Sequence, residues 1–182
     1  MAAPSFPLLL SGLAGAAPAP APGRVEGNGD FDGLVGEWTM HNRRLRKILA
    51  GSKDWYEFTS TCATRPIFGG RGQVDEYEAD LPDGKAHISG LTVRMFEPPA
   101  KKWRLYWANA NRGIFDDPVV GQFRDGVGEF IGPDSFEGKP ILVRFRWTNV
   151  NRGTPHWEQA FSPDDGKTWE TNWMNDLTPR HR

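Results

Sequence analysis

Tryptophan is the residue that most constrains the fold of this chain, because eight tryptophans are spread over 182 residues. Most stand in short segments in which bulky side chains occupy every second position, as in Trp103–Trp107 and Trp169–Trp173. Alternate side chains of a β-strand point to the same face, so this spacing places the large rings together. An antiparallel sheet closed on itself requires such inward-pointing bulk, and it offers aromatic surface to an organic guest where a cavity remains. The pattern predicts a container built of strands.

Charge and cysteine content exclude several classes of partner. The 22 Lys and Arg residues nearly balance the 23 Asp and Glu residues, for a formal net charge of −1. This balance gives no reason to expect nucleic acid or a membrane as a partner. The single cysteine, Cys62, excludes an internal disulfide, and its small strand-like neighbours favour a buried structural thiol over a nucleophile. The four histidines show no paired spacing, so we expect no metal site and no cofactor.

The first 29 residues differ in composition from the rest. Five prolines alternate there with alanine and glycine, and no charged residue precedes Arg24. Such a segment lacks the means to form a packed core, so we expect residues 1–29 to be a disordered leader. Residues 6–17 are also compatible with a cleaved export signal, although prolines interrupt them and no basic residue precedes them. The prediction is a cytoplasmic protein, with export as the alternative.

From Asp30 onward, strand-like segments alternate with turn residues. Residues 54–66 alternate apolar and polar side chains, and Pro82-Asp83-Gly84 and Arg124-Asp125-Gly126 mark tight turns. About nine or ten strands follow at a spacing of about 8–12 residues, and no segment keeps a helical period. We predict one all-β, antiparallel domain over residues 30–178, followed by a short tail at 179–182.

Alternation along each segment also predicts which side chains meet inside. One side of each segment is largely apolar, whereas the other carries charges such as Arg144 and Arg146. The predicted inward sets are Trp103, Leu105, Trp107 and Asn109; Ile141, Val143, Phe145 and Trp147; Trp157, Gln159 and Phe161; and Trp169, Thr171 and Trp173. Asn42 is a further polar residue expected in this interior. Buried amides need partners, either one another and bound water or a polar group of a ligand.

These faces lead to a first functional hypothesis, the binding of a small hydrophobic or aromatic molecule. The predicted ligand-binding residues are Trp38, Met40, Trp107, Asn109, Phe145, Trp157, Gln159 and Trp173. The aromatic side chains would form the walls, and the amides would orient a polar group of the guest. An alternative is an interaction module whose interior is filled by its own aromatic side chains, and the sequence leaves a homodimer open.

Charged residues on the strands lead to a second hypothesis, a cofactor-independent lyase, isomerase or cyclase. Acidic residues from Asp75 to Glu78 and Glu158 can pair across strands with arginines, and the outside of the barrel is the default place for such pairs. A pair inside the mouth would instead supply catalytic groups. The candidates are Glu76 or Glu158 as acid/base, with Arg94 or Arg44 stabilising negative charge.

A family resemblance supports the fold. The segment Asp30-Phe31-Asp32-Gly33-Leu34-Val35-Gly36-Glu37-Trp38 resembles the Gly-x-Trp opening of lipocalins. Together with the segments 74–76, 105–107, 143–147, 157–161 and 168–173, it is similar to a family of bacterial lipocalin-like (calycin-type) proteins of unknown function. The resemblance implies an up-and-down barrel with a short helical turn near its N-terminal end and Trp38 plugging its base. It implies no activity, because fold alone does not determine function.

A second local resemblance concerns one turn. Ser162 to Trp169, Ser-Pro-Asp-Asp-Gly-Lys-Thr-Trp, resembles the Asp-box of sialidase propellers. A propeller would require the box to recur in every blade, and it occurs once. The segment therefore predicts a hairpin whose Asp side chain caps backbone donors, and not a glycosidase.

Overall fold

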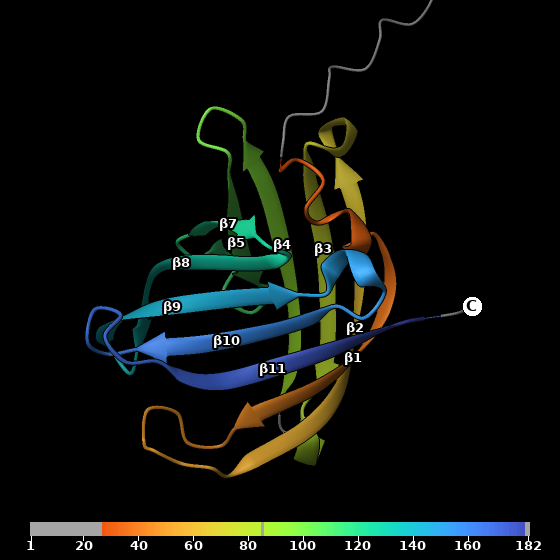
Figure 1. The fold of residues 1–182 in the computed structure, drawn as a ribbon. Coiled ribbons are helices and arrows are strands. Elements are labelled where there is room, and N and C mark those ends of the chain that lie inside the picture. Colours follow the sequence, from red (N-terminus) through yellow and green to blue (C-terminus); the bar gives the residue numbers. More distant parts are fainter. Residues whose placement is uncertain (1–26, 85, 181–182) are drawn as a thin grey trace, which may run out of the picture.

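The computed structural model describes residues 27–84 and 86–180, which form a closed antiparallel barrel of ten strands with one additional two-residue strand (Figure 1). The elements in chain order are η1 (Asp32–Leu34), β1 (Gly36–Leu45), β2 (Trp55–Ile67), η2 (Phe68–Gly70), β3 (Gly72–Asp80), η3 (Pro82–Gly84), β4 (His87–Glu97), β5 (Lys102–Asn109), β6 (Ile114–Phe115), β7 (Val119–Arg124), β8 (Val127–Phe136), β9 (Lys139–Thr148), η4 (Val150–Arg152), β10 (His156–Ser162) and β11 (Glu170–Pro179). The predicted fold class is confirmed. The described residues contain only short 3-10 turns besides the strands, and no helix among them is long and apolar enough to cross a membrane.

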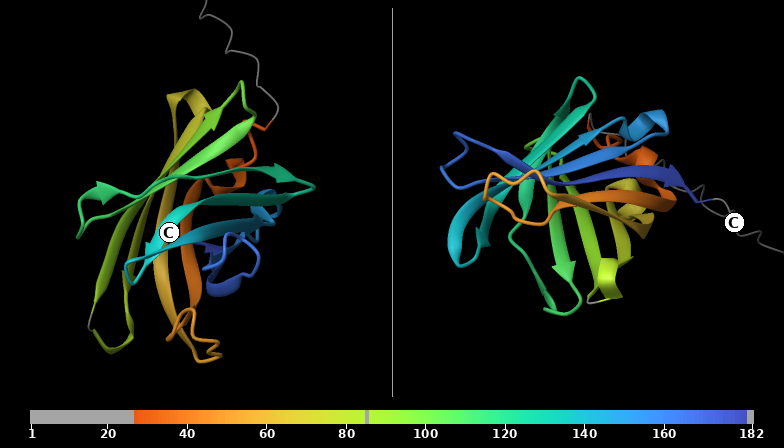
Figure 2. Two further views of the ribbon diagram at one scale, coloured as in Figure 1. Left: turned by 90° about the vertical axis from the view of Figure 1, so that its left-hand side faces the viewer. Right: turned by 90° about the horizontal axis from the view of Figure 1, so that it is seen from below.

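The strands follow an up-and-down order. Apart from β6, each strand pairs with the strands before and after it, so that β5 pairs with β4 and β7, and β1 pairs with β11 to close the barrel. The short β6 adds to the edge of β5 and takes no part in closure. Figure 2 shows the strands curving around one interior, with the two ends of the barrel wall, β1 and β11, side by side. The predicted turn between β7 and β8 is present, with positive φ at Asp125 (52°) and Gly126 (80°), as a tight two-residue hairpin requires.

One end of the barrel is closed by a cluster that we call the plug (Phe31, Leu34, Trp38 and Trp103). Phe31 is fully buried, and its ring lies 5.0 Å from that of Trp103 in an edge-to-face contact. Trp38 is 6% exposed and donates its indole N–H to the carbonyl of Leu34 at 2.7 Å. Trp38 is therefore buried beside the short helical turn η1, as the sequence predicts.

The part of the chain that packs on the barrel begins before residue 30, the predicted start of the domain. Asn28 is buried, and the carbonyl of Gly27 accepts a hydrogen bond from the Trp103 indole at 3.1 Å. Residues 27–29 thus pack on the barrel, and the rest of the predicted leader lies outside the described residues. Gly33 lets η1 approach η4 closely, since a Cβ there would lie 2.0 Å from the Val150 carbonyl oxygen.

A β-bulge between β10 and β11 changes one predicted face. The register shifts between Gln159 and Ala160, so that Asn172 becomes an extra residue on β11. Asn172 is fully buried, whereas Trp169 lies beneath the Arg144 guanidinium on the outside, 4.6 Å from it. The predicted common face of Trp169, Thr171 and Trp173 is therefore wrong, because the bulge reverses the alternation between the first and last of them.

The predicted capped hairpin at Ser162 to Trp169 is confirmed. One oxygen of Asp164 accepts the backbone N–H of Thr168 at 2.8 Å, and the other accepts the Thr168 hydroxyl at 2.6 Å. These hydrogen bonds to Thr168 hold the pKa of Asp164 at about 2. The Trp169 indole donates to the carbonyl of Gly166 at 3.0 Å, which fixes the ring against the turn. The motif has a mechanical role in joining β10 to β11.

Candidate ligand-binding cavity

A cavity of about 120 Å³ remains inside the barrel, next to the plug. Its walls are mostly aromatic and aliphatic, and a smaller polar set interrupts them. The residues that line it are Leu34, Met40, Cys62, Thr64, Asp75, Tyr77, Thr92, Arg94, Leu105, Trp107, Phe145, Trp147, Trp157, Gln159, Trp173, Asn175 and Leu177. All but Leu34 come from strands, namely β1 to β5 and β9 to β11, so closure of the sheet is what assembles the cavity.

Six of the eight predicted ligand-binding residues line this cavity, namely Met40, Trp107, Phe145, Trp157, Gln159 and Trp173. Trp38 does not line it, and its indole is instead bonded to the Leu34 carbonyl in the plug. Asn109 does not either. It is the last residue of β5, and its side-chain oxygen accepts the backbone N–H of Asn111 at 2.9 Å in a local turn. The side chain of this residue at the strand end is thus engaged by the backbone that follows it, as is common for asparagine in turns.

The cavity walls are held by edge-to-face contacts between aromatic rings. Trp157 contacts Phe145 and Trp173 at centroid distances of 5.1 and 5.7 Å. Across the barrel, Tyr77 contacts Trp107 at 6.0 Å. The Trp107 indole fits directly on Gly90, where a Cβ would lie 2.0 Å from the ring. The indoles thus touch their neighbours and still leave open space, unlike a core filled by its own aromatic side chains.

Asn42 on β1 organises part of this wall. Its side-chain nitrogen donates to the Ser60 hydroxyl at 2.8 Å, and its oxygen accepts from the Tyr77 hydroxyl at 3.1 Å and the Trp173 indole at 3.0 Å. Burial raises the pKa of Tyr77 to about 12, so the phenol is a neutral donor. The fully buried Asn42 is therefore satisfied within the protein, and it fixes two cavity-lining rings.

An ion pair lies in the cavity wall between β3 and β4. The Arg94 and Asp75 side chains are each 4% exposed, and Arg94 Nη1 lies 2.5 Å from Asp75 Oδ2. The guanidinium also lies over the rings of Phe31 and Trp147, at 5.2 and 5.5 Å from their centroids. Cross-strand charge pairs were expected outside the barrel by default, and this pair departs from that expectation. The alternation of Gln73, Asp75 and Tyr77, all buried, is the sequence signal for its inward position.

The other predicted catalytic residues do not line the cavity. Glu76 is exposed and lies 3.5 Å from Arg65 on the outside, since its neighbours in the strand point inward. Glu158 lies 3.2 Å from His156 and 4.0 Å from Arg146. Arg44 lies 4.7 Å from the ring centroid of Trp173, on which its guanidinium stacks. Of the four candidates, only Arg94 reaches the cavity, and Asp75 is the carboxylate that sequence reasoning did not select.

Several buried polar atoms around the cavity make no hydrogen bond. They include Arg94 Nε, Trp147 Nε1 and Asn175 Oδ1, all on residues that line the cavity. Arg94 Nη1 lies 2.5 Å from Asp75 Oδ2 and is therefore paired with that carboxylate. Buried donors and acceptors are almost always paired, so unpaired groups around a cavity point to a partner that enters it.

Cys62 also lines the cavity, and its environment makes a direct prediction. It is 8% exposed, and its pKa is raised to about 12, chiefly by burial and further by the Asp75 carboxylate, with Arg94 opposing. The reactive thiolate is thus a negligible fraction at pH 8. We expect a chromogenic disulfide reagent to modify the native protein about a hundredfold or more slower than the protein unfolded in urea. Equal rates in the two states would show that the thiol is accessible and ionised.

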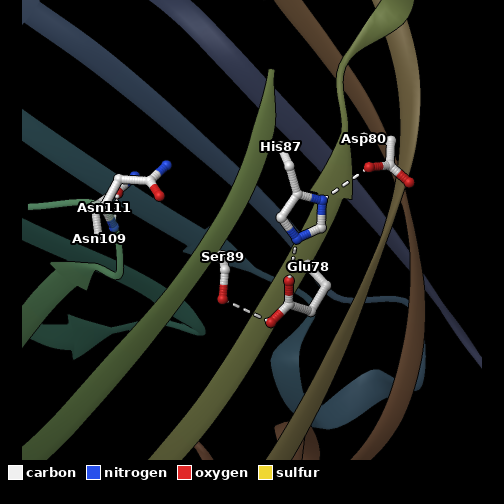
Figure 3. A network of polar contacts seen from close by, with 6 residues as sticks. All are labelled: Glu78, Asp80, His87, Ser89, Asn109 and Asn111. Carbon is white, nitrogen blue, oxygen red and sulfur yellow. Dashed lines mark hydrogen bonds and ion pairs between the residues drawn. The ribbon is translucent and has the colours of Figure 1, made fainter. Parts of the chain in front are cut away.

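A second polar network lies on the outer surface at one end of β3 and β4 (Figure 3). His87 contacts Asp80 at 2.8 Å and Glu78 at 2.7 Å, and these hydrogen bonds raise the pKa of His87. Ser89 donates to Glu78 at 2.7 Å. All of these side chains are outside the cavity. Within residues 27–84 and 86–180, no group of three His, Cys, Asp or Glu side chains is arranged to hold a metal ion.

Comparison with known proteins extends the description of the fold. No family model matches the chain, and no curated protein is detectably similar to it in sequence. Among solved structures, it is similar to Rv2717c from M. tuberculosis, with a TM-score of 0.57, 13% identity, and coverage of 82% of this chain and 94% of that one. It is also similar to the S-type phycobiliprotein lyase CPES from Guillardia theta, with a TM-score of 0.59, 12% identity, and coverage of 84% and 91%. The chain therefore shares the lipocalin-like ten-stranded barrel with these proteins.

Proposed function

We propose that this chain binds a small, largely apolar or aromatic molecule inside its barrel. The observation that carries the proposal is the cavity of about 120 Å³ left between aromatic side chains that already contact one another. A dry cavity of about 150 Å³ is known to accept benzene, so a guest with one aromatic ring is the appropriate scale. Apolar walls with a few convergent polar groups are typical of ligand sites.

A second candidate is a cofactor-independent enzyme that uses the same cavity. One observation favours it, the presence of the buried Asp75–Arg94 pair in the cavity wall. Asp75 would then take the acid/base role that the sequence assigned to Glu76 or Glu158. The resemblance to a phycobiliprotein lyase concerns the fold alone at 12% identity. We favour binding, because the Asp75 carboxylate is already engaged by an arginine, which suits orienting a guest better than abstracting its proton.

Titration with a neutral aromatic probe tests the binding proposal. We expect nitrobenzene, a neutral probe with one aromatic ring, to quench the tryptophan fluorescence saturably with one site per chain, because several indoles line the cavity. Trp107→Ala should lower the affinity for the probe at least several-fold, since it removes one aromatic side chain from the cavity wall. Trp55→Ala is the matched control, because Trp55 contacts Arg43 on the outside and does not line the cavity. Quenching that rises linearly without saturation would contradict the proposal.

A further inference from the structure

The cavity contains a feature that selects among apolar guests, and the inference drawn from it rests on the proposed binding function. We propose that the corner formed by Asp75, Arg94 and Trp147, here called the polar corner, receives a neutral hydrogen-bond acceptor. The carbonyl oxygen of an aromatic ketone, aldehyde or amide is the chemistry that fits. A carboxylate does not fit, although an arginine is present.

Two donors at the polar corner have no partner within the protein. Arg94 Nε and Trp147 Nε1 are buried without hydrogen bonds, and both residues line the cavity. The guanidinium lies 5.5 Å from the Trp147 ring centroid, so the two side chains form one local group. A guanidinium carries five N–H donors, and an indole carries one. An acceptor atom entering here would satisfy donors that the protein itself leaves unpaired.

The charges of Asp75 and Arg94 balance one another at the polar corner. Asp75 lies 2.5 Å from Arg94, and both side chains are 4% exposed, so the polar corner is already electrically neutral. A carboxylate guest would bring a second negative charge to this buried pair, next to the Asp75 oxygen atoms. Burying an unbalanced charge is far more costly than burying a neutral acceptor that finds a donor. The pair therefore supplies hydrogen bonds without supplying net positive charge.

The rest of the cavity suits the apolar part of such a guest. Beyond the polar corner, the cavity is bounded by apolar and aromatic side chains such as Leu105, Phe145 and Trp157. A guest with one aromatic ring and one carbonyl group can place its ring among these side chains and its oxygen at the polar corner. Arg44 supplies no competing anion site within the cavity, because it stacks on Trp173 and does not line the cavity.

Three probes of similar size test the inference by calorimetric titration: ethylbenzene, acetophenone and benzoate. We expect acetophenone to bind the native protein more tightly than benzoate. The double variant Asp75→Asn, Arg94→Met leaves no charge in the cavity wall. In this variant the affinity for acetophenone should fall about tenfold or more, whereas the affinity for ethylbenzene should change little. In Asp75→Asn alone, benzoate should gain about tenfold or more, because Arg94 then carries an unbalanced charge.

Glu97→Gln is the matched control for charge, because Glu97 pairs with Arg104 at 2.9 Å on the surface. It removes the same carboxylate charge and should leave all three affinities unchanged. Should Asp75→Asn fail to fold, the comparison of native protein with the double variant carries the test, with circular dichroism verifying each fold.

The outcomes separate this inference from the function beneath it. Benzoate binding the native protein as tightly as acetophenone would overturn the neutral-acceptor assignment and indicate an anion site. If the double variant loses the same affinity for acetophenone as for ethylbenzene, or loses none for either, the role of the polar corner is overturned and the binding function stays in place. Failure of all three probes to bind would count against the binding function itself, and the inference would fall with it.

Discussion

Replacing Trp38 by alanine is expected to lower the free energy of unfolding by about 3–5 kcal/mol, the usual cost of truncating a large buried aromatic side chain. The side chain is 6% exposed in the plug, so its removal leaves a cavity that the surrounding strands cannot fill. The variant also loses the hydrogen bond from the indole to the Leu34 carbonyl. Urea unfolding followed by circular dichroism measures the change.

Two further variants interpret that result. Trp38→Phe keeps most of the ring volume and loses the N–H donor, so it should cost less than the alanine variant. Trp55→Ala removes a tryptophan that contacts Arg43 on the outer surface, and we expect it to cost about 1 kcal/mol. If Trp38→Ala unfolds at the same urea concentration as the parent protein, Trp38 does not support the closed end.

The second large effect is expected at the buried ion pair. Arg94→Met should destabilise the protein by about 3–5 kcal/mol, because it leaves the Asp75 carboxylate buried without its partner. Adding Asp75→Asn should restore a large part of that loss, since no unpaired charge then remains. A double-mutant cycle on urea unfolding gives the coupling between the two side chains.

Arg104→Met is the surface comparison for this cycle. Arg104 and Glu97 lie on neighbouring strands at 2.9 Å, but their side chains are 42% and 40% exposed. Breaking such a pair should cost about 0–1 kcal/mol. Similar losses of stability for Arg104→Met and Arg94→Met would mean that the Asp75–Arg94 pair is hydrated in solution and that the polar corner is not a buried neutral site.

Much of this architecture could be predicted from the sequence because a strand has a simple period. Alternation was sufficient to place Trp107, Phe145 and Trp157 in one interior, and turn residues located the hairpins. The turn that begins at Ser162 was also predictable, because its hydrogen bonds are made within a few residues. The short β6 was missed, since a two-residue strand has no period to detect.

The failures occur where something other than alternation decides the side-chain direction. At Asn172 an extra residue in the strand reverses the faces, and no residue type announces such a bulge. Asn109 lies at a strand end, where its own backbone offers a nearer partner. Asp75 and Arg94 follow the alternation correctly, but general experience with charged pairs argued for the outside. Three-dimensional pairing was needed to show that each charge has the other as its partner.

The pairing of β1 with β11 has a consequence for how the chain folds. Thr39 and Thr178 are opposite one another in the ladder, 139 residues apart in sequence. Every other closure of the wall involves strands that are neighbours in the chain or nearly so, and these hairpins can form early. The pairing of β1 with β11 cannot form until β11 has been synthesised, and long-range pairing of this kind slows folding. During synthesis, therefore, the barrel cannot close until β11 has left the ribosome. Until then the aromatic interior of the open sheet is exposed to solvent and prone to aggregation.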